Sequence, residues 1–143
     1  MKYEMPSAPG GASVAETCIE VRHVSRWFGA SKPGAVTQAE IDLRVGGRYR
    51  IVTRLPDGGA NDVSGHYEEV VRHRRLVFTW AWASTPERIS RVSIDFVAGD
   101  AGTALHFVHD RFFDEQARAN HERGWSSLFE HLDGFLRQRT REV

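Results

Sequence analysis

The last part of the chain contains one long amphipathic helix, and this helix limits the folds open to everything before it. Asp114 is a good N-cap, because its carboxylate can accept hydrogen bonds from the free backbone N–H groups of a first turn. From there to Arg139, inward-facing residues recur at steps of three and four, which places them on one helical face. These positions are Ala117, His121, Trp125, Leu128, Leu132 and Phe135 or Leu136, with Phe129 widening the stripe. The preceding strands must supply the surface on which this face lies.

Gly124 interrupts the helix directly before Trp125. A glycine inside a helix costs about 1 kcal/mol relative to alanine, so its presence asks for a reason. One interpretation is close backbone packing against a strand. The other is that Gly124 leaves open volume over the sheet while Trp125 forms a wall. The spacing of the residues leaves both open.

From Ala35 onward the apolar period changes to two, which is typical of β-strands. Turn sequences such as Gly46-Gly47 and Pro56-Asp57-Gly58-Gly59 separate the runs. Six strands joined by such short turns form an antiparallel meander, because parallel crossovers need longer connections. We expect the strands over Val36–Val45, Arg48–Leu55, Asp62–Val71 with room for a bulge, Arg75–Ala83, Ile89–Ala98, and from Thr103 to Phe112 or Phe113.

The first part of the chain adds smaller elements to this sheet. Lys2–Ser7 predicts a short first strand at one edge, and two weak helical windows follow at Ala12–Val21 and Val24–Phe28. Short helices need tertiary packing, so both should dock on the sheet. The expected fold class is α+β. It is a curved antiparallel sheet of about seven strands around the long C-terminal helix, in one domain over residues 1–143.

Composition and charge exclude several classes of function. The 19 Lys and Arg residues balance the 19 Asp and Glu residues, so no basic excess is present to bind nucleic acid. No apolar run or polybasic amphipathic segment indicates a membrane partner, and the N-terminus lacks a signal-peptide core. A single cysteine, Cys18, excludes an intrachain disulfide framework. We expect a cytoplasmic protein.

Several segments together resemble the START-like (SRPBCC) superfamily. More narrowly, they resemble the family named after the C-terminal domain of the activator of the heat-shock-protein-90 ATPase. The resemblance implies a helix-grip fold, in which a strand, two short helices, a six-strand meander and a final helix enclose an elongated apolar cavity. The segments are Ser25–Gly29, Glu40–Ile51, Pro56–Gly58, Arg75–Trp80 and His121 through Gly124 and Trp125.

The chain also departs from that family's pattern. Its first helix, in the run Gly11–Cys18, is less aromatic than usual. The family commonly has a glycine shortly after the last-strand histidine, where this chain has Arg111, so the cavity mouth is expected to differ. The chaperone activators also carry a separate N-terminal domain, and we expect no counterpart of it here. We therefore do not expect a chaperone as the main partner.

A large aromatic set faces inward in the expected fold. Core packing accounts for any one of these residues, because aromatic side chains dominate core energetics. For the set as a whole we expect a partly open pocket for a small hydrophobic molecule, with Tyr49, Thr53 and His109 as its polar points. The candidate ligand-binding residues are Trp27, Phe28, Tyr49, Ile51, Thr53, Phe78, Trp80, Trp82, Phe107, His109, His121, Trp125 and Phe129.

Catalytic and metal-binding patterns are weak in this sequence. His109 is the best candidate for acid–base chemistry, since the ordinary pKa of histidine lies near neutrality. No acidic residue shares its strand face to orient it, so a satisfied core histidine is the simpler interpretation, and the same holds for His121. The seven histidines and one cysteine show no zinc-ligand spacing. We expect no metal and no cofactor.

The sequence therefore favours a non-catalytic domain that binds a small hydrophobic or aromatic molecule between sheet and helix. Two alternatives stay open, because one fold hosts many functions. The first is an enzyme of the polyketide cyclase or aromatase type that uses His109, Tyr49 or Thr53 to move protons. The second is a chaperone-related interaction module that uses the convex face of the sheet. A homodimer is also left open.

Overall fold

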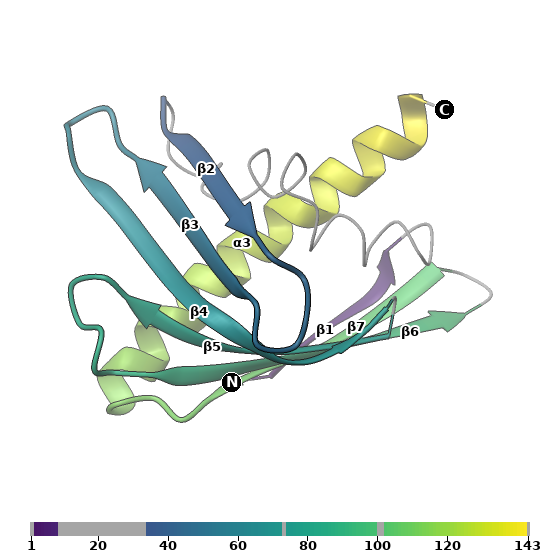
Figure 1. The fold of residues 1–143 in the computed structure, drawn as a ribbon. Helices are drawn as coiled ribbons and strands as arrows, with labels where there is room; N and C mark the ends of the chain where they lie inside the picture. The colour runs from purple at the N-terminus through teal and green to yellow at the C-terminus, as the bar shows by residue number, and fades with distance from the viewer. Residues whose placement is uncertain (1, 9–33, 73, 100–101, 143) are drawn as a thin grey trace.

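The computed structural model describes residues 2–8, 34–72, 74–99 and 102–142, which form a sheet of seven strands and one long helix (Figure 1). Both helical windows expected between Ala12 and Phe28 lie outside the described residues. The elements are β1 (Lys2–Ala8), β2 (Val36–Ile41), β3 (Arg48–Arg54), β4 (Ala60–Val71), β5 (Arg75–Trp82), β6 (Ser90–Gly99), β7 (Gly102–Asp110) and α3 (Glu115–Glu142).

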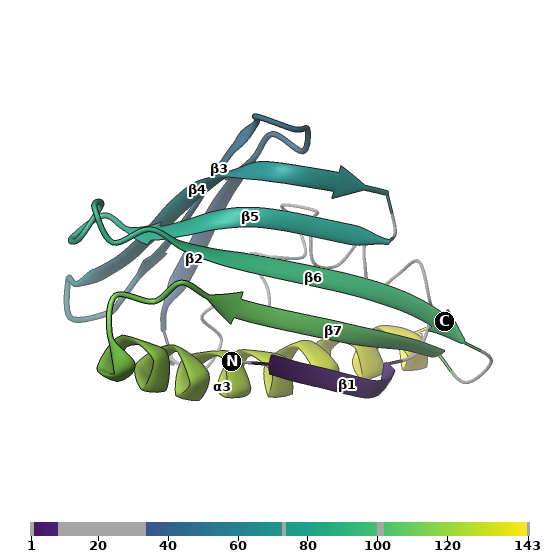
Figure 2. The ribbon, with the colours of Figure 1, turned by 90° about the horizontal axis from the view of Figure 1, so that it is seen from below.

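The strands follow the order β1-β7-β6-β5-β4-β3-β2, and every neighbouring pair is antiparallel. The expected six-strand meander is confirmed as β2 to β7. The first strand closes one edge by pairing with β7, also as expected (Figure 2). The pairing of β4 with β5 shifts between Tyr67 and Glu69, which confirms the bulge.

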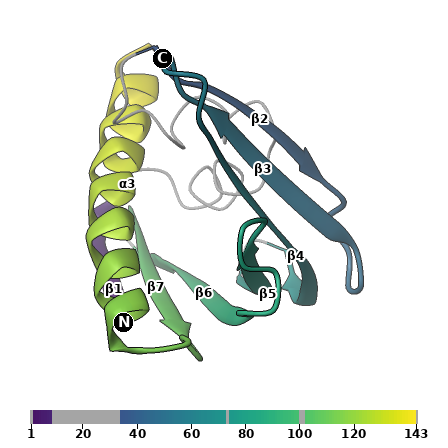
Figure 3. The same cartoon turned by 90° about the vertical axis from the view of Figure 1, so that its left-hand side faces the viewer.

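The long helix α3 lies across the concave side of the sheet, while β2, β3 and β4 rise away from it (Figures 1 and 3). Its start is as expected: the backbone N–H of Ala117 donates to Asp114 Oδ1 over 2.8 Å. None of the described helical residues form a stretch long and apolar enough to cross a lipid bilayer.

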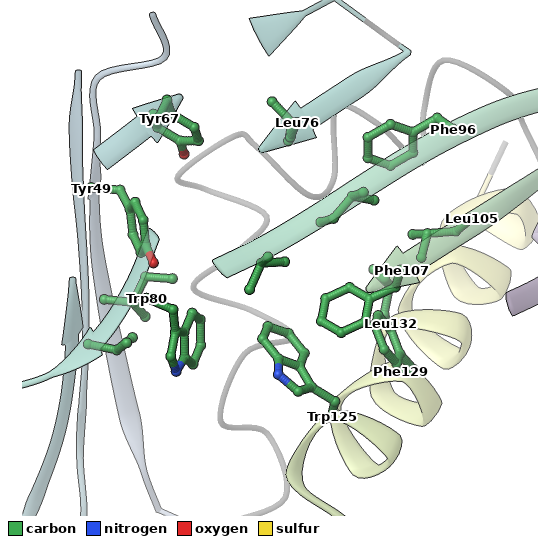
Figure 4. Close-up of a cluster of buried hydrophobic side chains, with 14 residues drawn as sticks. Tyr49, Tyr67, Leu76, Trp80, Phe96, Leu105, Phe107, Trp125, Phe129 and Leu132 are labelled. Carbon is green, nitrogen blue, oxygen red and sulfur yellow. The ribbon is translucent and has the colours of Figure 1, made fainter. Parts of the chain in front are cut away.

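The core lies between this helix and the sheet (Figure 4). Trp125 and Phe129 of α3 pack on Phe107 of β7, with ring centroids 4.6 and 5.0 Å apart. Trp125 also meets Trp80 of β5 at 5.0 Å. The alternation predicted for β5, β6 and β7 is confirmed, because the inward residues belong to one cluster. From these strands it contains Leu76, Trp80, Val92, Ile94, Phe96, Leu105 and Phe107, and the partly buried Phe78 and Trp82 pack against it.

Two strands end at least two residues earlier than predicted. The last strand stops at Asp110 instead of continuing to Phe112 or Phe113. Arg111 has a φ of 63°, a left-handed conformation that glycine adopts most easily, and it turns the chain toward the helix. The strand β2 ends at Ile41 instead of Val45, because the chain then turns: the N–H of Gly47 donates to the carbonyl of Arg44 over 2.8 Å.

Gly65 allows three strands to come together at one point of the sheet. It pairs with Tyr49 in β3, and the Tyr49 hydroxyl reaches β5, where it donates to the Thr79 carbonyl over 2.6 Å. The position has no room for a side chain, since a Cβ on Gly65 would lie 2.0 Å from the Thr79 oxygen. Glycine is therefore required here by the close approach of β4 to β5.

We predict that Gly65→Ala destabilises the protein by about 2 kcal/mol or more, because the added methyl group forces the two strands apart. Urea denaturation followed by circular dichroism measures this loss. Gly134→Ala is the matched control: a Cβ at Gly134 meets no described atom within 4 Å, and the same change should raise helix stability by up to about 1 kcal/mol. Equal unfolding free energies for the two variants would contradict the close approach.

Candidate functional site

A pocket of about 430 Å³ opens at one end of the groove between the sheet and the N-terminal half of α3. The end of β5, the β5–β6 and β7–α3 connections and the first half of the helix supply most of its wall. Its lining consists of Thr53, Asn61, Trp80, Trp82, Thr85, Arg88, Ser90, Phe112, Phe113, Ala117, Asn120, His121, Gly124, Trp125, Ser127 and Leu128.

The apolar wall of the pocket is built from aromatic residues that the strand and helix periods place on facing surfaces. Trp80 and Trp125 are nearly fully buried and contact each other, whereas Trp82 is partly exposed. Gly124 lies beside Trp125 in the same wall, and a Cβ built there meets no atom of the described residues within 4 Å. No described strand packs closely on Gly124, and among the described residues the missing side chain leaves open volume.

His121 joins the helix to two tryptophans of β5. Its Nε2 accepts hydrogen bonds from the indole Nε1 of Trp82 over 2.9 Å and of Trp80 over 3.3 Å. Its Nδ1 lies 2.7 Å from the carbonyl oxygen of Ala117, one helical turn earlier, to which it donates. Both ring nitrogens therefore serve to hold the walls of the pocket.

His109 is fully buried in β7 and also has both ring nitrogens bonded. Its Nδ1 accepts from Trp125 Nε1 over 2.9 Å, so the hydrogen sits on Nε2 and is donated to Ser90 Oγ, 2.6 Å away. Ser90 in turn donates to the carbonyl oxygen of Trp80 over 3.3 Å. The result is a continuous chain of hydrogen bonds from α3 through β7 and β6 to β5.

This arrangement keeps His109 neutral. Burial, and then the proximity of His121, lower the pKa of His109 from 6.5 to about 3. In the unfolded chain the imidazole takes up a proton below about pH 6.5, whereas the folded protein resists it. The contribution of His109 to stability is therefore complete above pH 6.5 and is lost as the pH falls toward 3.

The same bonds decide whether Ser90 and His109 form a nucleophilic pair. In a serine–histidine pair, the histidine nitrogen facing the serine must accept the hydroxyl proton. Here the indole of Trp125 donates to Nδ1, so Nε2 is the protonated nitrogen and donates to Ser90. The short contact resembles a catalytic dyad in distance, but its proton lies on the wrong atom for activating the serine.

Five of the residues expected from the sequence line the pocket: Thr53, Trp80, Trp82, His121 and Trp125. Of the other candidates, Trp27 and Phe28 lie outside the described residues. Tyr49 and His109, expected as polar points, are buried away from the lining, and burial raises the pKa of Tyr49 well above its ordinary value. Of the remaining candidates, Ile51, Phe107 and Phe129 belong to the core cluster, and Phe78 packs against it.

Sequence reasoning missed the part of the lining that comes from connections. Thr85, Arg88, Phe112 and Phe113 follow strand ends, where no period indicates which way a side chain faces. Asn120 was missed for another reason, since it lies outside the apolar stripe of the helix. The chain turns after β5 and after β7, and these two turns bring the residues together at the opening of the pocket.

Metal-ligand geometry is not found among the described residues, where no group of three or more His, Cys, Asp and Glu side chains converges. The two histidines near the pocket have ring centroids 5.1 Å apart, and each uses its ring nitrogens in the bonds described above.

Comparison with protein families now adds to this geometry. Residues 16–137 match the family model for activator of Hsp90 ATPase homolog 1-like proteins, which is most of the chain. The chain belongs to this family. A search of curated proteins gives no match.

Solved structures with the same fold accompany this family match. Protein CV1439 from Chromobacterium violaceum is 20% identical, with a TM-score of 0.84 over 95% of this chain and 96% of that one. An AHSA1-like protein from Aeromonas hydrophila is 19% identical, with a TM-score of 0.81 over 98% and 93%. A Staphylococcus aureus protein of unknown function is 20% identical, with a TM-score of 0.76 over 99% and 94%. At these identities the likeness establishes the fold.

The protonation state of His109 gives a direct test of the site. We predict that ¹⁵N spectra of the imidazoles show His109 with its hydrogen on Nε2 and no titration between pH 8 and about 5, because its pKa lies near 3. His109→Gln identifies the signals by their loss. That variant should also reduce the acid-induced fall in unfolding free energy, by up to about 1.4 kcal/mol per pH unit. A His109 signal that titrates near pH 6.5 would contradict the buried network.

Proposed function

We propose that this protein binds a small apolar or aromatic molecule in the pocket between its sheet and the N-terminal half of α3. The observation that carries the proposal is the open volume of about 430 Å³ beside Gly124, walled by tryptophans. Small-molecule sites are typically concave, mostly apolar and about 300–1,000 Å³ in volume, with a few polar groups that orient the ligand. The size and lining of this pocket support a ligand of that kind.

The hydrogen bonds around the pocket favour binding over catalysis. A cyclase-type reaction would need His109, Tyr49 or Thr53 to exchange protons with the ligand. His109 and Tyr49 are buried outside the lining, with their polar atoms bonded to Ser90, Trp125 and the Thr79 carbonyl. Thr53 lines the pocket, its hydroxyl lies 3.0 Å from that of Thr37, and no base among the described residues forms a hydrogen bond with it. We therefore propose a binding protein.

The test is to fill the pocket without disturbing the fold. We predict that Gly124→Leu weakens binding of the neutral fluorescent probe N-phenyl-1-naphthylamine by at least about tenfold, since the new side chain occupies open volume. Leucine is also a better helix former than glycine, so the variant should unfold at the same urea concentration as the parent or higher. Fluorescence titration measures the binding, and circular dichroism measures the stability.

Gly134→Leu is the matched control for this experiment. Gly134 lies in the same helix, meets open space in the same way and does not line the pocket. Its substitution should change helix stability similarly and leave the probe affinity within about twofold of the parent. The proposed function would be rejected if the parent fails to bind the probe, or if both leucine variants bind it equally well.

A further inference from the structure

We infer that the ligand of this pocket carries an anionic group, and that Arg88 at the mouth binds that group. This inference rests on the proposed function and makes it more specific: it assigns the ligand to the class of amphipathic aromatic anions, such as aromatic carboxylates or sulfonates. Three observations on the described residues carry it: the Arg88 side chain has no carboxylate partner, the lining holds no acidic residue, and hydrogen-bond donors lie near the opening.

The Arg88 side chain has no carboxylate partner among the described residues, unlike several arginines of the sheet and helix. Ion pairs on the sheet and helix engage the guanidinium groups of Arg50, Arg75, Arg91 and Arg118. Within the described part of the chain, no hydrogen bond or ion pair engages the Arg88 side chain, while its backbone N–H donates to the Thr85 carbonyl. The guanidinium carbon lies 3.9 Å above the centre of the Phe113 ring. Such stacking holds the guanidinium plane in place and leaves its N–H donors directed outward around the edge.

The lining has one sign of charge. Among its described residues Arg88 is the only ionised side chain, and no aspartate or glutamate is present. A cation beside an apolar wall is attracted to an anion more strongly than a cation in bulk water, because low-dielectric surroundings weaken the screening. An anionic ligand would therefore gain from this position, whereas a cationic ligand would be repelled.

The neutral polar groups of the pocket divide in a way that agrees with an anion at the mouth. On the β5 wall of the pocket, the indole N–H groups of Trp80 and Trp82 are already donated to His121, so that wall presents apolar surface. Near the exposed side, Asn120 Oδ1 accepts from the Gln116 side chain over 3.0 Å, which leaves its amide Nδ2 as a donor for a ligand. The pocket thus combines a buried apolar wall with donors at its opening.

Two fluorescent probes of nearly the same shape test the inference. One is 8-anilino-1-naphthalenesulfonate, and the other is N-phenyl-1-naphthylamine, the same skeleton without the sulfonate. We expect Arg88→Gln to weaken binding of the sulfonate probe by about tenfold, as the loss of a charge-assisted hydrogen bond implies. Binding of the neutral probe should stay within about twofold, because its apolar contacts remain. Added salt should weaken only the sulfonate probe.

Arg54→Gln is the control, because it removes the same charge from an exposed arginine of β3 outside the lining. It should change neither probe by more than about twofold. The inference is overturned if Arg88→Gln leaves the sulfonate probe unaffected, or weakens both probes equally, which would make Arg88 a structural residue. In either case the proposed function stands as long as the parent binds the neutral probe. If the parent binds neither probe, both conclusions fail together.

Discussion

The reciprocal hydrogen bonds between helix and sheet are the constraint on which the rest of this structure depends. The helix donates through the Trp125 indole to His109 of β7, and β5 donates through two indoles to His121 of the helix. A buried indole N–H without a partner would cost about 1–3 kcal/mol, so each tryptophan needs an acceptor at one particular place. Apolar contacts alone would let the helix slide on the sheet, whereas these bonds select one position along its axis.

His109 and His121, the residues best suited to acid–base chemistry, serve instead to join the packed elements. A neutral imidazole has one donor and one acceptor nitrogen, so it can relay hydrogen bonds through an apolar interior. His109 does so between Trp125 and Ser90, and His121 between two indoles and the helix backbone. Each histidine thereby lets large aromatic side chains be buried with their polar atoms satisfied. The network and the aromatic core are one structure, and the pocket lies at its edge.

The pocket exists because the helix places no side chain in the groove at Gly124. Trp125 packs against Trp80 and closes the interior, while Gly124 beside it contributes no side chain toward the opening. The β5–β6 and β7–α3 connections then form the rim, including the left-handed turn at Arg111. Members of the activator of Hsp90 ATPase homolog 1-like family share the sheet and helix, so differences in function are expected at such rim positions, where a side chain can change without disturbing the core.

The sequence by itself determined the meander, its added edge strand, the inward faces of β5 to β7 and the helix with its Asp114 cap. These follow from local rules: a period of two or 3.6, turn residues between runs, and a carboxylate ahead of an apolar stripe. Only the tertiary structure decided which inward residues border empty space. The strand period turns Tyr49 and Phe107 inward and the helical period does the same for Trp125, yet Tyr49 spans Gly65 to reach β5, Phe107 is enclosed by the helix, and Trp125 borders the pocket. Periodicity predicts which face of an element a residue occupies, but not what lies opposite that face. Which residues face one another across the groove is decided by contacts between segments far apart in the chain.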